Sequence, residues 1–406
     1  MQIEIDNVKG FQDFLSPESL KRDAIRKVVE RYFKLYGFQP IETPLIEFDE
    51  LMKSDVLQEE DEAVSDRFRL KDRGGRNLGL RYEFTFQLSR IFKQNPNIRL
   101  PFKRYQIGEN FRDEPIGTGR FRQFTQCDAD IVGDSNIESE SEILAMFSDI
   151  LKELKVNAEI HVNNRKLLNA IIESVEIKDP KNVMRELDKL DKIGEDNLKA
   201  NLRKYADSNQ IVTLFKLLEK PLEFFIENAF DGATELESLF DFSKKYGLKL
   251  KLNLLMIRGF AYYTGNIIEI RSLESKGSIA GGGRYDKVVG RYLNKEITAF
   301  GLSFGLERLS SLAKVKLESI PKALLISIDE NNAAIKLIKQ LRKEGISCIK
   351  TTEKVGKSLE YANAQSIPYV IFLGQDEVQK ERFKLKNMIS GDEKFLTEKQ
   401  LIRALK

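Results

Sequence analysis

The spacing of hydrophobic and polar residues predicts a helix near the start of the chain. Over residues 17–36, apolar residues recur every three or four positions and charged residues fill the positions between them. Gly37 follows as a typical helix stop. The next segment contains Pro40 and Pro44, so we expect an extended strand that lies at a sheet edge or an interface.

Strand-like and helical patterns alternate over the next part of the chain. Residues 76–95 pass from a strand-like segment, NLGLRYEFT, into a helical one, FQLSRIFKQN. Residues 101–133 contain two extended runs around the connector EPIGTG, which predicts a hairpin with a flexible tip. A helical pattern then covers about 136–154 and a strand pattern covers 156–162. This alternation is typical of a domain that mixes helices and strands.

A helical texture replaces this alternation between about residue 165 and residue 250. Stretches rich in Lys, Glu and Leu show almost no strand pattern there, which predicts an inserted helical domain. The strand-like segments LKLNLLMI and GNIIEIRS follow it. After them we expect a glycine loop, AGGGRYD, and a long helix that begins near Leu302. The first architecture therefore resumes after the insertion.

The last part of the chain has the rhythm of a separate small domain. From Pro321 onward, strand-like and helical segments follow one another as β-α-β-α-β, which predicts a compact three-layer α/β domain. The Lys- and Glu-rich approach at 315–321 is typical of a linker. We therefore expect a first core segment at 1–164, a helical insertion at 165–250, a second core segment at 251–318 and an α/β domain at 321–406.

The composition is that of a folded globular protein with more than one domain. At 406 residues the chain exceeds what one hydrophobic core usually serves, and 41% of its residues are hydrophobic. The 66 basic and 63 acidic residues nearly cancel, so a nucleic-acid surface would have to be a local patch. Neither a signal peptide nor a membrane-spanning apolar run is present in the sequence, so we expect a cytoplasmic protein.

Cysteine and histidine usage argues against several kinds of site. Cys127 and Cys348 lie far apart and form no C-x-x-C pair, which argues against a zinc ribbon and a disulfide framework. His161 is the single histidine, so a histidine-rich metal site is excluded within one chain. It lies in the alternating run AEIHVNN, where a packed histidine is a better interpretation than a catalytic one.

Two short segments carry residues that suit phosphate and nucleotide chemistry. Arg112 and Glu114 in FRDE would share one face of an extended strand, where a guanidinium can hold a phosphate and a carboxylate can accept from an amino group. Phe124, across the hairpin, would offer a ring for a base. An exposed hairpin held by salt bridges explains these residues equally well. In FGLSFGLERL, glycine-rich extended chain runs into a helix with Arg308, a common arrangement that also suits a nucleotide and its outermost phosphate.

The order and spacing of these segments decide between the interpretations. A helix and proline-bearing strand, then F-R-x-E, then G-L-x-R at a helix start resemble the three signature motifs of class II aminoacyl-tRNA synthetases. The resemblance narrows to the histidyl-tRNA synthetase family with LRYEFT at 80–85, RQFTQCDADIVG at 122–133, IRGFAYYTG at 257–265 and AGGGRYD at 280–286. It covers nearly the whole chain, and its motifs are specific in combination.

The resemblance implies a fold and an activity. The fold is α+β, with the antiparallel-sheet catalytic core of class II synthetases, a helical insertion and a C-terminal α/β anticodon-binding domain. In the reaction, L-histidine and ATP, with Mg²⁺ on the triphosphate, give histidyl-adenylate and pyrophosphate, and histidine then passes to the 3′ end of tRNA(His). The segment 17–46 resembles the dimer-interface element of the class, which implies a symmetric homodimer. Internal core explains the apolar face of its helix equally well.

The resemblance also implies site residues. It assigns histidine binding to Glu83, Thr85, Arg112, Gln126, Asp130, Arg258, Tyr262 and Tyr263, ATP binding to Arg112, Glu114, Phe124 and Arg308, and catalysis to Arg112 and Arg258. Glu83 and Thr85 would hold the α-ammonium group. Asp130 and Tyr263 would bind the ring nitrogens, and only one of the adjacent tyrosines would face the pocket if their segment is extended. No dedicated metal site is assigned, and Ala261 stands where the family often has Asp.

Two functions from other classes share parts of this pattern. A regulatory subunit of ATP phosphoribosyltransferase has the synthetase core and binds histidine only as a signal. The C-terminal domain, which that subunit lacks, and the presence of Arg112, Glu114, Arg258 and Arg308 favour the enzyme. A histidine- or tRNA-sensing module, as in certain kinases, is the least favoured, because the chain has no kinase glycine loop and no H-R-D segment.

Overall fold

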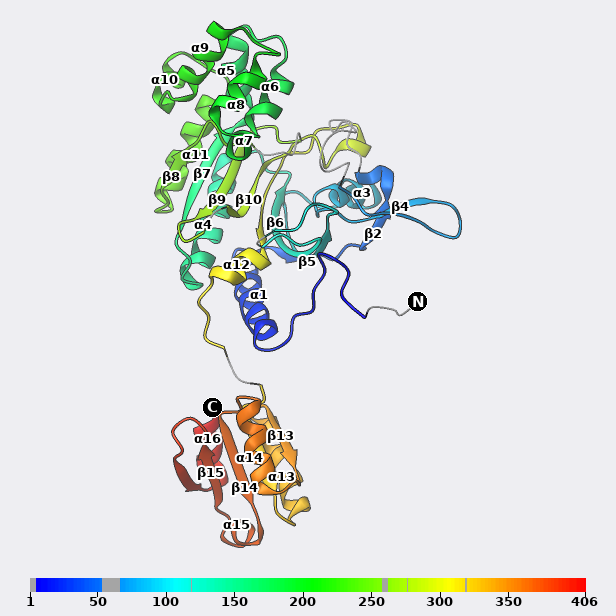
Figure 1. Cartoon of the computed structure of the whole chain (residues 1–406), viewed down its shortest axis with the longest axis vertical. Coiled ribbons are helices and arrows are strands. Elements are labelled where there is room, and N and C mark those ends of the chain that lie inside the picture. The colour runs from blue at the N-terminus through cyan, green and yellow to red at the C-terminus, as the bar shows by residue number, and fades with distance from the viewer. Residues whose placement is uncertain (1–4, 53–65, 118, 258–261, 276, 318–319) are drawn as a thin grey trace. The chain divides into compact units, whose positions relative to one another are not determined.

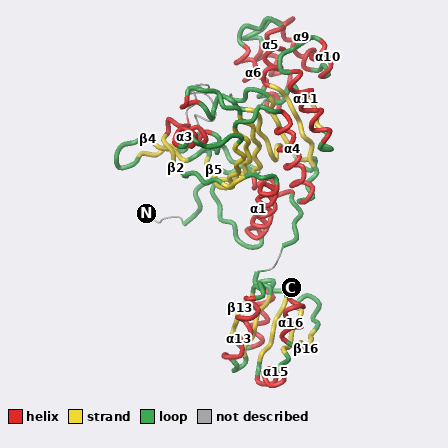
Figure 2. The backbone as a smooth tube through the Cα atoms, turned by 180° about the vertical axis from the view of Figure 1, so that it is seen from behind, coloured by secondary structure: helices red, strands yellow, loops and turns green. Residues whose placement is uncertain are grey.

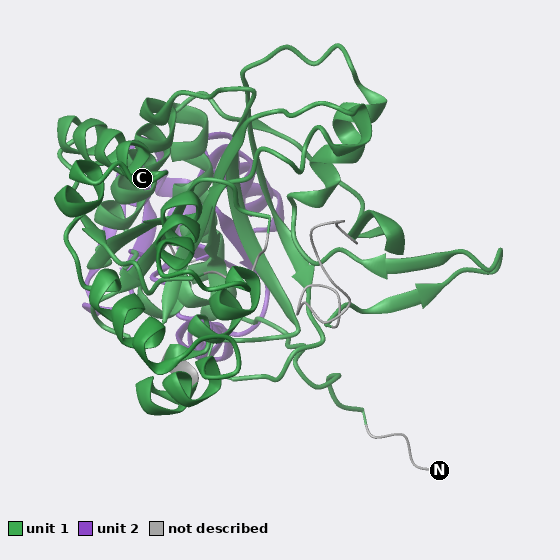
Figure 3. Ribbon diagram, turned by 90° about the horizontal axis from the view of Figure 1, so that it is seen from above, with its two compact units in different colours: residues 1–315 green, residues 316–406 purple. Residues whose placement is uncertain are grey.

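The chain folds as two compact units, Met1–Val315 and Lys316–Lys406, which Figure 3 colours separately. The computed structural model describes residues 5–52, 66–117, 119–257, 262–275, 277–317 and 320–406. Within these ranges, every hydrophobic cluster belongs to one unit or to the other. Each unit therefore has its own core, as a separate domain does.

A large sheet forms the centre of the first unit (Figure 1). Among the described residues it has eight strands in the order β1-β5-β6-β11-β10-β9-β7-β8. Their bounds are β1 Gln39–Pro40, β5 Phe102–Phe111, β6 Gln123–Val132, β7 Ala158–Asn164, β8 Leu250–Leu252, β9 Asn266–Ser272, β10 Ser278–Arg284 and β11 Ala299–Gly305. The edge pairs, β1 with β5 and β7 with β8, are parallel, and the pairs between them are antiparallel. The α+β core with an antiparallel sheet is confirmed.

Helices α1, α4 and α11 pack together against this sheet (Figure 2). Their bounds are Glu18–Leu35, Ile137–Glu153 and Ala233–Lys245. The apolar face of α1 is buried at Ile25, Val29 and Phe33, as its helical spacing predicts. Phe147 of α4 stacks on Phe304 of β11, with ring centroids 4.3 Å apart. The helices thereby hold the strands that carry the site.

A small sheet of the first unit carries a projecting hairpin (Figure 1). Its order is β2-β4-β3, with β2 Ile46–Phe48, β3 Arg69–Lys71 and β4 Asn77–Leu80, and it is accompanied by η1 Asp49–Met52, α3 Phe86–Gln94 and η2 Arg291–Leu293. The strand predicted around Pro40 and Pro44 is thus divided between β1 and β2. Its expected place at a sheet edge is confirmed by β1, because a proline cannot donate to a neighbouring strand.

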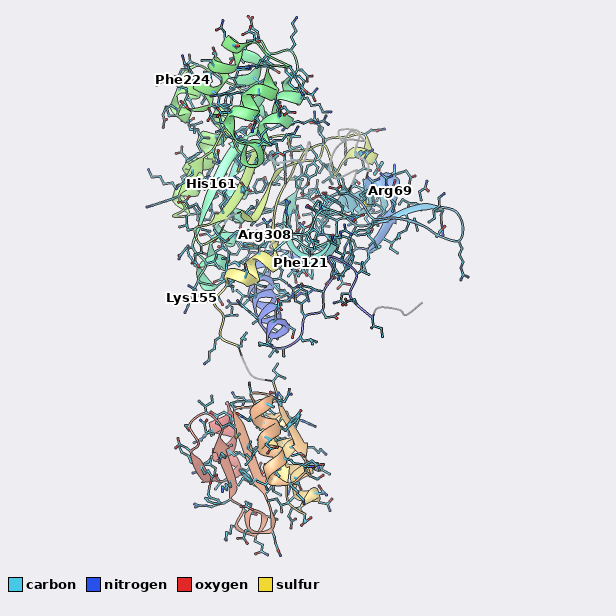
Figure 4. The ribbon with its side chains drawn as sticks, viewed as in Figure 1. Arg69, Phe121, Lys155, His161, Phe224 and Arg308 are labelled. Atoms are coloured by element: carbon cyan, nitrogen blue, oxygen red, sulfur yellow. The ribbon has the colours of Figure 1, made fainter. Side chains whose placement is uncertain are left out.

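The segment between β7 and β8 is helical, and Figure 4 marks Phe224 within it. Its bounds are α5 Arg165–Ser174, α6 Pro180–Leu187, α7 Leu190–Ile193, α8 Glu195–Leu202, α9 Ser208–Leu218, α10 Leu222–Glu227 and α11. Helix α5 starts directly after β7 because the side chain of Asn164 accepts the backbone N–H groups of Lys166 and Leu167. Helix α11 packs against α4 and β7, so the end of this segment belongs to the core of the first unit.

Two predicted elements of the first unit are wrong. The glycines of AGGGRYD lie in β10 rather than in a loop, and they pair with β9 and β11. Glycine is required there by close packing, since a Cβ on Gly282 would lie 1.9 Å from the carbonyl oxygen of Gly301. The chain at Leu302 is still strand β11, because residues 299–305 pair with β6. The helix that follows, α12, spans only Leu306–Leu312.

The second unit has helices on both sides of a sheet. Within the described residues its strands follow the order β13-β12-β14-β15-β16. Their bounds, with those of the helices, are β12 Ala323–Ser327, α13 Asn331–Lys343, β13 Cys348–Thr351, α14 Val355–Ala364, β14 Tyr369–Leu373, α15 Gln375–Lys380, β15 Phe383–Asn387, β16 Glu393–Leu396 and α16 Glu398–Leu405. Ala323 and Leu325 of β12 join one hydrophobic cluster, and Leu324 and Ile326 join another. The predicted three-layer β-α-β-α-β rhythm is confirmed, and β15, β16 and α16 extend it.

Candidate active site

A pocket on the large sheet brings together residues that are far apart in the sequence. It has a volume of about 220 Å³, and its lining includes parts of β6, β10, β11 and α12. Every site residue expected from the resemblance and described by the structure lies in this lining: Glu83, Thr85, Arg112, Glu114, Phe124, Gln126, Asp130, Tyr262, Tyr263 and Arg308. Arg258 and Ala261 lie outside the described residues.

One end of the pocket is formed by a buried carboxylate. Glu83 and Thr85 lie in the loop before α3, and each is at most 6% exposed. The hydroxyl of Tyr262 donates to Oε2 of Glu83 over 2.8 Å. Burial raises the pKa of Glu83 to about 7, and the bond from Tyr262 lowers it less strongly. This end of the pocket therefore offers a carboxylate that an incoming cation would help to ionise.

Both adjacent tyrosines reach the pocket. Tyr262 and Tyr263 are buried, line the pocket, and have ring centroids 4.9 Å apart. The expectation that only one faces it assumed an extended segment, in which successive side chains point in opposite directions. The chain turns at Tyr262 before β9 begins at Asn266, so that assumption does not hold.

The middle of the pocket is a polar stripe on β6. Gln126, Asp128 and Asp130 alternate along this strand and all line the pocket, as period-two spacing predicts. Asn110 Nδ2 donates to Gln126 Oε1 over 2.7 Å, and Gln126 Nε2 donates to Ser303 Oγ over 2.8 Å. Neighbouring strands thus hold this stripe in one orientation.

Asp130 accepts a hydrogen bond on one oxygen and forms an ion pair through the other. The hydroxyl of Tyr285 donates to Oδ1, and Nη2 of Arg104 lies 2.7 Å from Oδ2. Arg104 stands directly opposite Asp130 in the register of β5 and β6. The side chains of this arginine and this carboxylate are 0% and 5% exposed. The sheet therefore contains a buried ion pair at the pocket wall.

The other end of the pocket carries arginines and an aromatic ring. Arg112 and Glu114 follow the end of β5 at Phe111, so the expected strand geometry is wrong for them. They still approach each other, with Nη1 and Oε1 3.7 Å apart, because the hairpin loop turns both into the pocket. The guanidinium of Arg112 lies 5.0 Å from the ring centre of Phe124. Arg112, Glu114 and Phe124 therefore lie together, as predicted. The hairpin loop, and not a shared strand face, brings them together.

Arg308 stands in the first turn of α12, between the hairpin and the start of β10. Its Nη1 donates to the carbonyl oxygen of Ser278 over 2.6 Å. A Cβ on Gly119 would lie 3.2 Å from its Cγ. Figure 4 shows Arg308 near Phe121 of the hairpin, and both line the pocket. The helix start thus places a cation at this end, as the sequence predicts.

Family models match both units of the chain. Residues 10–309 match the model described as "Histidyl-tRNA synthetase", and residues 322–406 match the "Anticodon binding domain". The chain belongs to the histidyl-tRNA synthetase family.

Similar proteins extend over nearly the whole chain. "Histidine--tRNA ligase 1" of Bacillus cereus is 35% identical over 96% of this chain and 95% of its own length. "Histidine--tRNA ligase" of Christiangramia forsetii is 35% identical over 98% of both chains. The crystal structure of histidyl-tRNA synthetase from Nostoc sp. has a TM-score of 0.86 and 25% identity, and covers 100% of this chain and 99% of that one.

Three polar residues of this histidyl-tRNA synthetase site were not assigned from the sequence. The sequence does contain a feature that indicates a pocket position for Asp128, because this residue alternates with Gln126 and Asp130. Tyr285 also had one, because it lies within AGGGRYD. Arg104 had none, since an arginine in an extended run normally predicts a solvated position.

The single histidine and the two cysteines are not part of the pocket lining. His161 stands on β7 and its Nε2 lies 3.5 Å from Oε2 of Glu159; it is not among the pocket residues (Figure 4). Cys127 and Cys348 are free and buried. Within the described ranges, no group of three or more His, Cys, Asp and Glu residues is placed to hold a metal, and no helix is long and apolar enough to cross a membrane.

Proposed function

We propose that the chain is a cytoplasmic histidine–tRNA ligase. It activates L-histidine with ATP to histidyl-adenylate and pyrophosphate, and transfers histidine to the 3′ end of tRNA(His). The observation that carries the proposal is the pocket itself. A buried carboxylate, two arginines and an aromatic ring in one pocket suit an amino acid and a nucleotide side by side.

The amino acid would lie at the end with Glu83. A buried carboxylate and the hydroxyl of Thr85 suit the α-ammonium cation, because a desolvated charge needs a charged or hydrogen-bonding partner. Gln126, Asp130 and Tyr263 would bind the rest of the histidine, with Tyr262 holding Glu83 in place. An imidazole ring presents one donor and one acceptor, so a carboxylate and a phenol can satisfy both.

The nucleotide would lie at the end with Arg308. Phe124 is half-buried and would pack against adenine, while Glu114 would accept from its amino group. Arg112 would hold the α-phosphate and Arg308 the γ-phosphate, where guanidinium groups neutralise charge and donate in pairs. Mg²⁺ would enter with the triphosphate and share its charge.

The reaction needs no covalent bond to the protein. The histidine carboxylate attacks the α-phosphorus in line and pyrophosphate leaves, after which a ribose hydroxyl of the tRNA attacks the mixed anhydride. Arg112 and Arg258 would neutralise the charge of the α-phosphate. Catalysis then rests on positioning and charge neutralisation, which explains how a chain with a single histidine side chain performs it.

The protein would act on tRNA as a symmetric homodimer, with the second unit binding the anticodon. The apolar face of α1 is internal core, so this helix leaves that face unavailable to a second chain. The small sheet has exposed apolar side chains instead, with Ile46, Phe48 and Leu70 46%, 53% and 39% exposed. Phe48 and Leu70 both stand opposite Leu78, so they share one face. A shared apolar face of this kind supports pairing with a second copy.

ATP–pyrophosphate exchange, with each amino acid tried in turn, tests the proposed activity. Exchange is expected with histidine alone and should fall at least about a hundredfold in Arg112→Ala, which loses the phosphate contact. Arg73→Ala, at an exposed position of the projecting hairpin, is the matched control and should exchange normally. Histidine binding without exchange by the unaltered protein would reject the ligase and favour the regulatory subunit.

A further inference from the structure

A fully buried arginine contacts a residue of the pocket wall and does not itself line the pocket. Arg104 is 0% exposed and is the largest side chain among those that are fully buried in the described structure. Its Nη2 lies 2.7 Å from Oδ2 of Asp130, which does line the pocket. We propose that Arg104 is a positioning residue that keeps Asp130 ionised and turned toward the ring of the amino-acid substrate. This inference rests on the proposed function.

The geometry allows Asp130 little other freedom. Arg104 approaches one carboxylate oxygen from β5, and the hydroxyl of Tyr285 donates to the other. On the third side, β11 passes so close that a Cβ on Gly301 would lie 1.9 Å from Oδ1. The carboxylate is therefore fixed between an arginine, a phenol and a glycine backbone, and the pocket is the side left open.

Burial alone would leave Asp130 uncharged. Desolvation raises the pKa of Asp130 above its ordinary value, and the positive charge of Arg104 is the largest influence that opposes this rise. The same burial raises the pKa of Asp128 to about 8. Among the described residues, the other titratable or charged groups around this part of the pocket are Asp128 on β6, Glu83 before α3, Arg112 after β5, Tyr262 and Tyr263 before β9, and Tyr285 after β10.

One buried cation therefore faces two neighbouring buried carboxylates on β6. Because Arg104 contacts Asp130 directly and Asp128 only through space, its charge favours ionisation of Asp130 over ionisation of Asp128. An ionised Asp130 accepts from the N–H of an imidazole ring. A protonated Asp130 would instead present a donor and weaken that contact. Arg104 would thus set the preference for a ring with an N–H without touching the substrate.

The test compares Arg104→Gln and Arg104→Lys with the unaltered protein in histidine-dependent exchange, from about pH 6 to about pH 9. In Arg104→Gln the KM for histidine should rise at least about tenfold at neutral pH, and the rise should shrink as higher pH ionises Asp130. The KM for ATP should stay within about twofold, and Arg104→Lys should resemble the unaltered protein across the range. A merely structural role would change both KM values and leave their pH dependence alone.

Arg104→Gln could fail to fold because it leaves the Asp130 carboxylate buried without a cation. A second comparison therefore removes that carboxylate as well. In the Asp130→Asn protein the carboxylate is gone, so adding Arg104→Gln should change the histidine KM less than about twofold. Two results would overturn this inference and leave the proposed function standing. One is a further tenfold rise in the histidine KM of the double variant, and the other is a histidine KM for Arg104→Gln that is raised equally at every pH. An unaltered protein without histidine-dependent exchange would instead overturn the proposed function, and the inference with it.

Discussion

At the scale of the residue, Glu83 shows a conflict between stability and function. The carboxylate is buried, and its pKa rises from 4.5 to about 7 on folding. Between these values the folded chain binds one proton more than the unfolded chain, so the free energy of unfolding falls as pH rises through this range. Ionisation of this buried carboxylate is therefore unfavourable near neutral pH, and a cation beside it, as in the proposed contact with the α-ammonium group, would offset that cost.

Glu83→Gln should therefore separate stability from activity. Above about pH 7 the variant should be more stable than the unaltered protein by on the order of 2 kcal/mol, and this gain should disappear toward about pH 4.5. Histidine-dependent exchange should be lost at every pH, because an amide cannot pair with the α-ammonium group. Urea unfolding at both ends of the range measures the first effect. The exposed Glu237→Gln is the control, and a similar gain there would contradict the account.

At the scale of the element, one carboxylate links strand β6 to helices α12 and α1. Glu307 accepts the backbone N–H of Thr125 over 3.0 Å and 3.1 Å with its two oxygens. It also accepts from Nη2 of Arg22 over 2.9 Å. Thr125 adjoins Phe124, and Glu307 adjoins Arg308. The link therefore sets the distance between the two elements that form the proposed nucleotide end.

Two arginines of α1 test this link, since each pairs with one glutamate. In the pair Arg22 and Glu307 the side chains are 14% and 6% exposed, and in the pair Arg31 and Glu153 they are 59% and 37% exposed. Arg22→Ala should lower the free energy of unfolding by about 3 kcal/mol and raise the KM for ATP, because a buried carboxylate loses its cation. Arg31→Ala should cost less than about 1 kcal/mol. If urea unfolding shows the same loss of unfolding free energy for both variants, burial does not determine the contribution of these ion pairs.

At the scale of the whole molecule, the surface of the small sheet explains why a second copy is expected. Its exposed apolar side chains come from β2 and β3, whose polar neighbours point the other way. An apolar sheet face of this kind is costly in water. Helices α1 and α4 and the large sheet form a core in the first unit to which this face of the small sheet does not contribute. The proposed homodimer would cover this face.

Phe48→Asp should convert the proposed dimer to a monomer. A charge in an apolar contact between copies appears twice across a symmetry axis, so its cost is doubled. Sedimentation equilibrium should give twice 46.7 kDa for the unaltered chain and about that mass itself for the variant. Ile389→Asp, at a position 87% exposed in the second unit, is the control and should remain a dimer. A monomeric unaltered chain would reject the homodimer.

Much of the fold could be predicted from local pattern. The apolar spacing around Ile25 and Phe33 predicts α1, because a helix repeats every 3.6 residues and buries one face. The alternation of Gln126 and Asp130 predicts a shared strand face, and the hairpin follows from its Pro and Gly connector. For the site, every motif residue from Glu83 to Arg308 that the sequence assigns and the structure describes lines the pocket, but these residues are fewer than half of the lining.

The sequence by itself thus determined the periodic elements, the family and the residue types of the pocket, because each depends on spacing along one segment. Only the tertiary structure decided what depends on neighbours from elsewhere in the chain. Gly282 reads locally as a loop residue, yet it stands in mid-sheet because the carbonyl of Gly301 leaves no room for a side chain. Arg104 locally resembles a surface cation, yet it is buried because Asp130 faces it from the neighbouring strand.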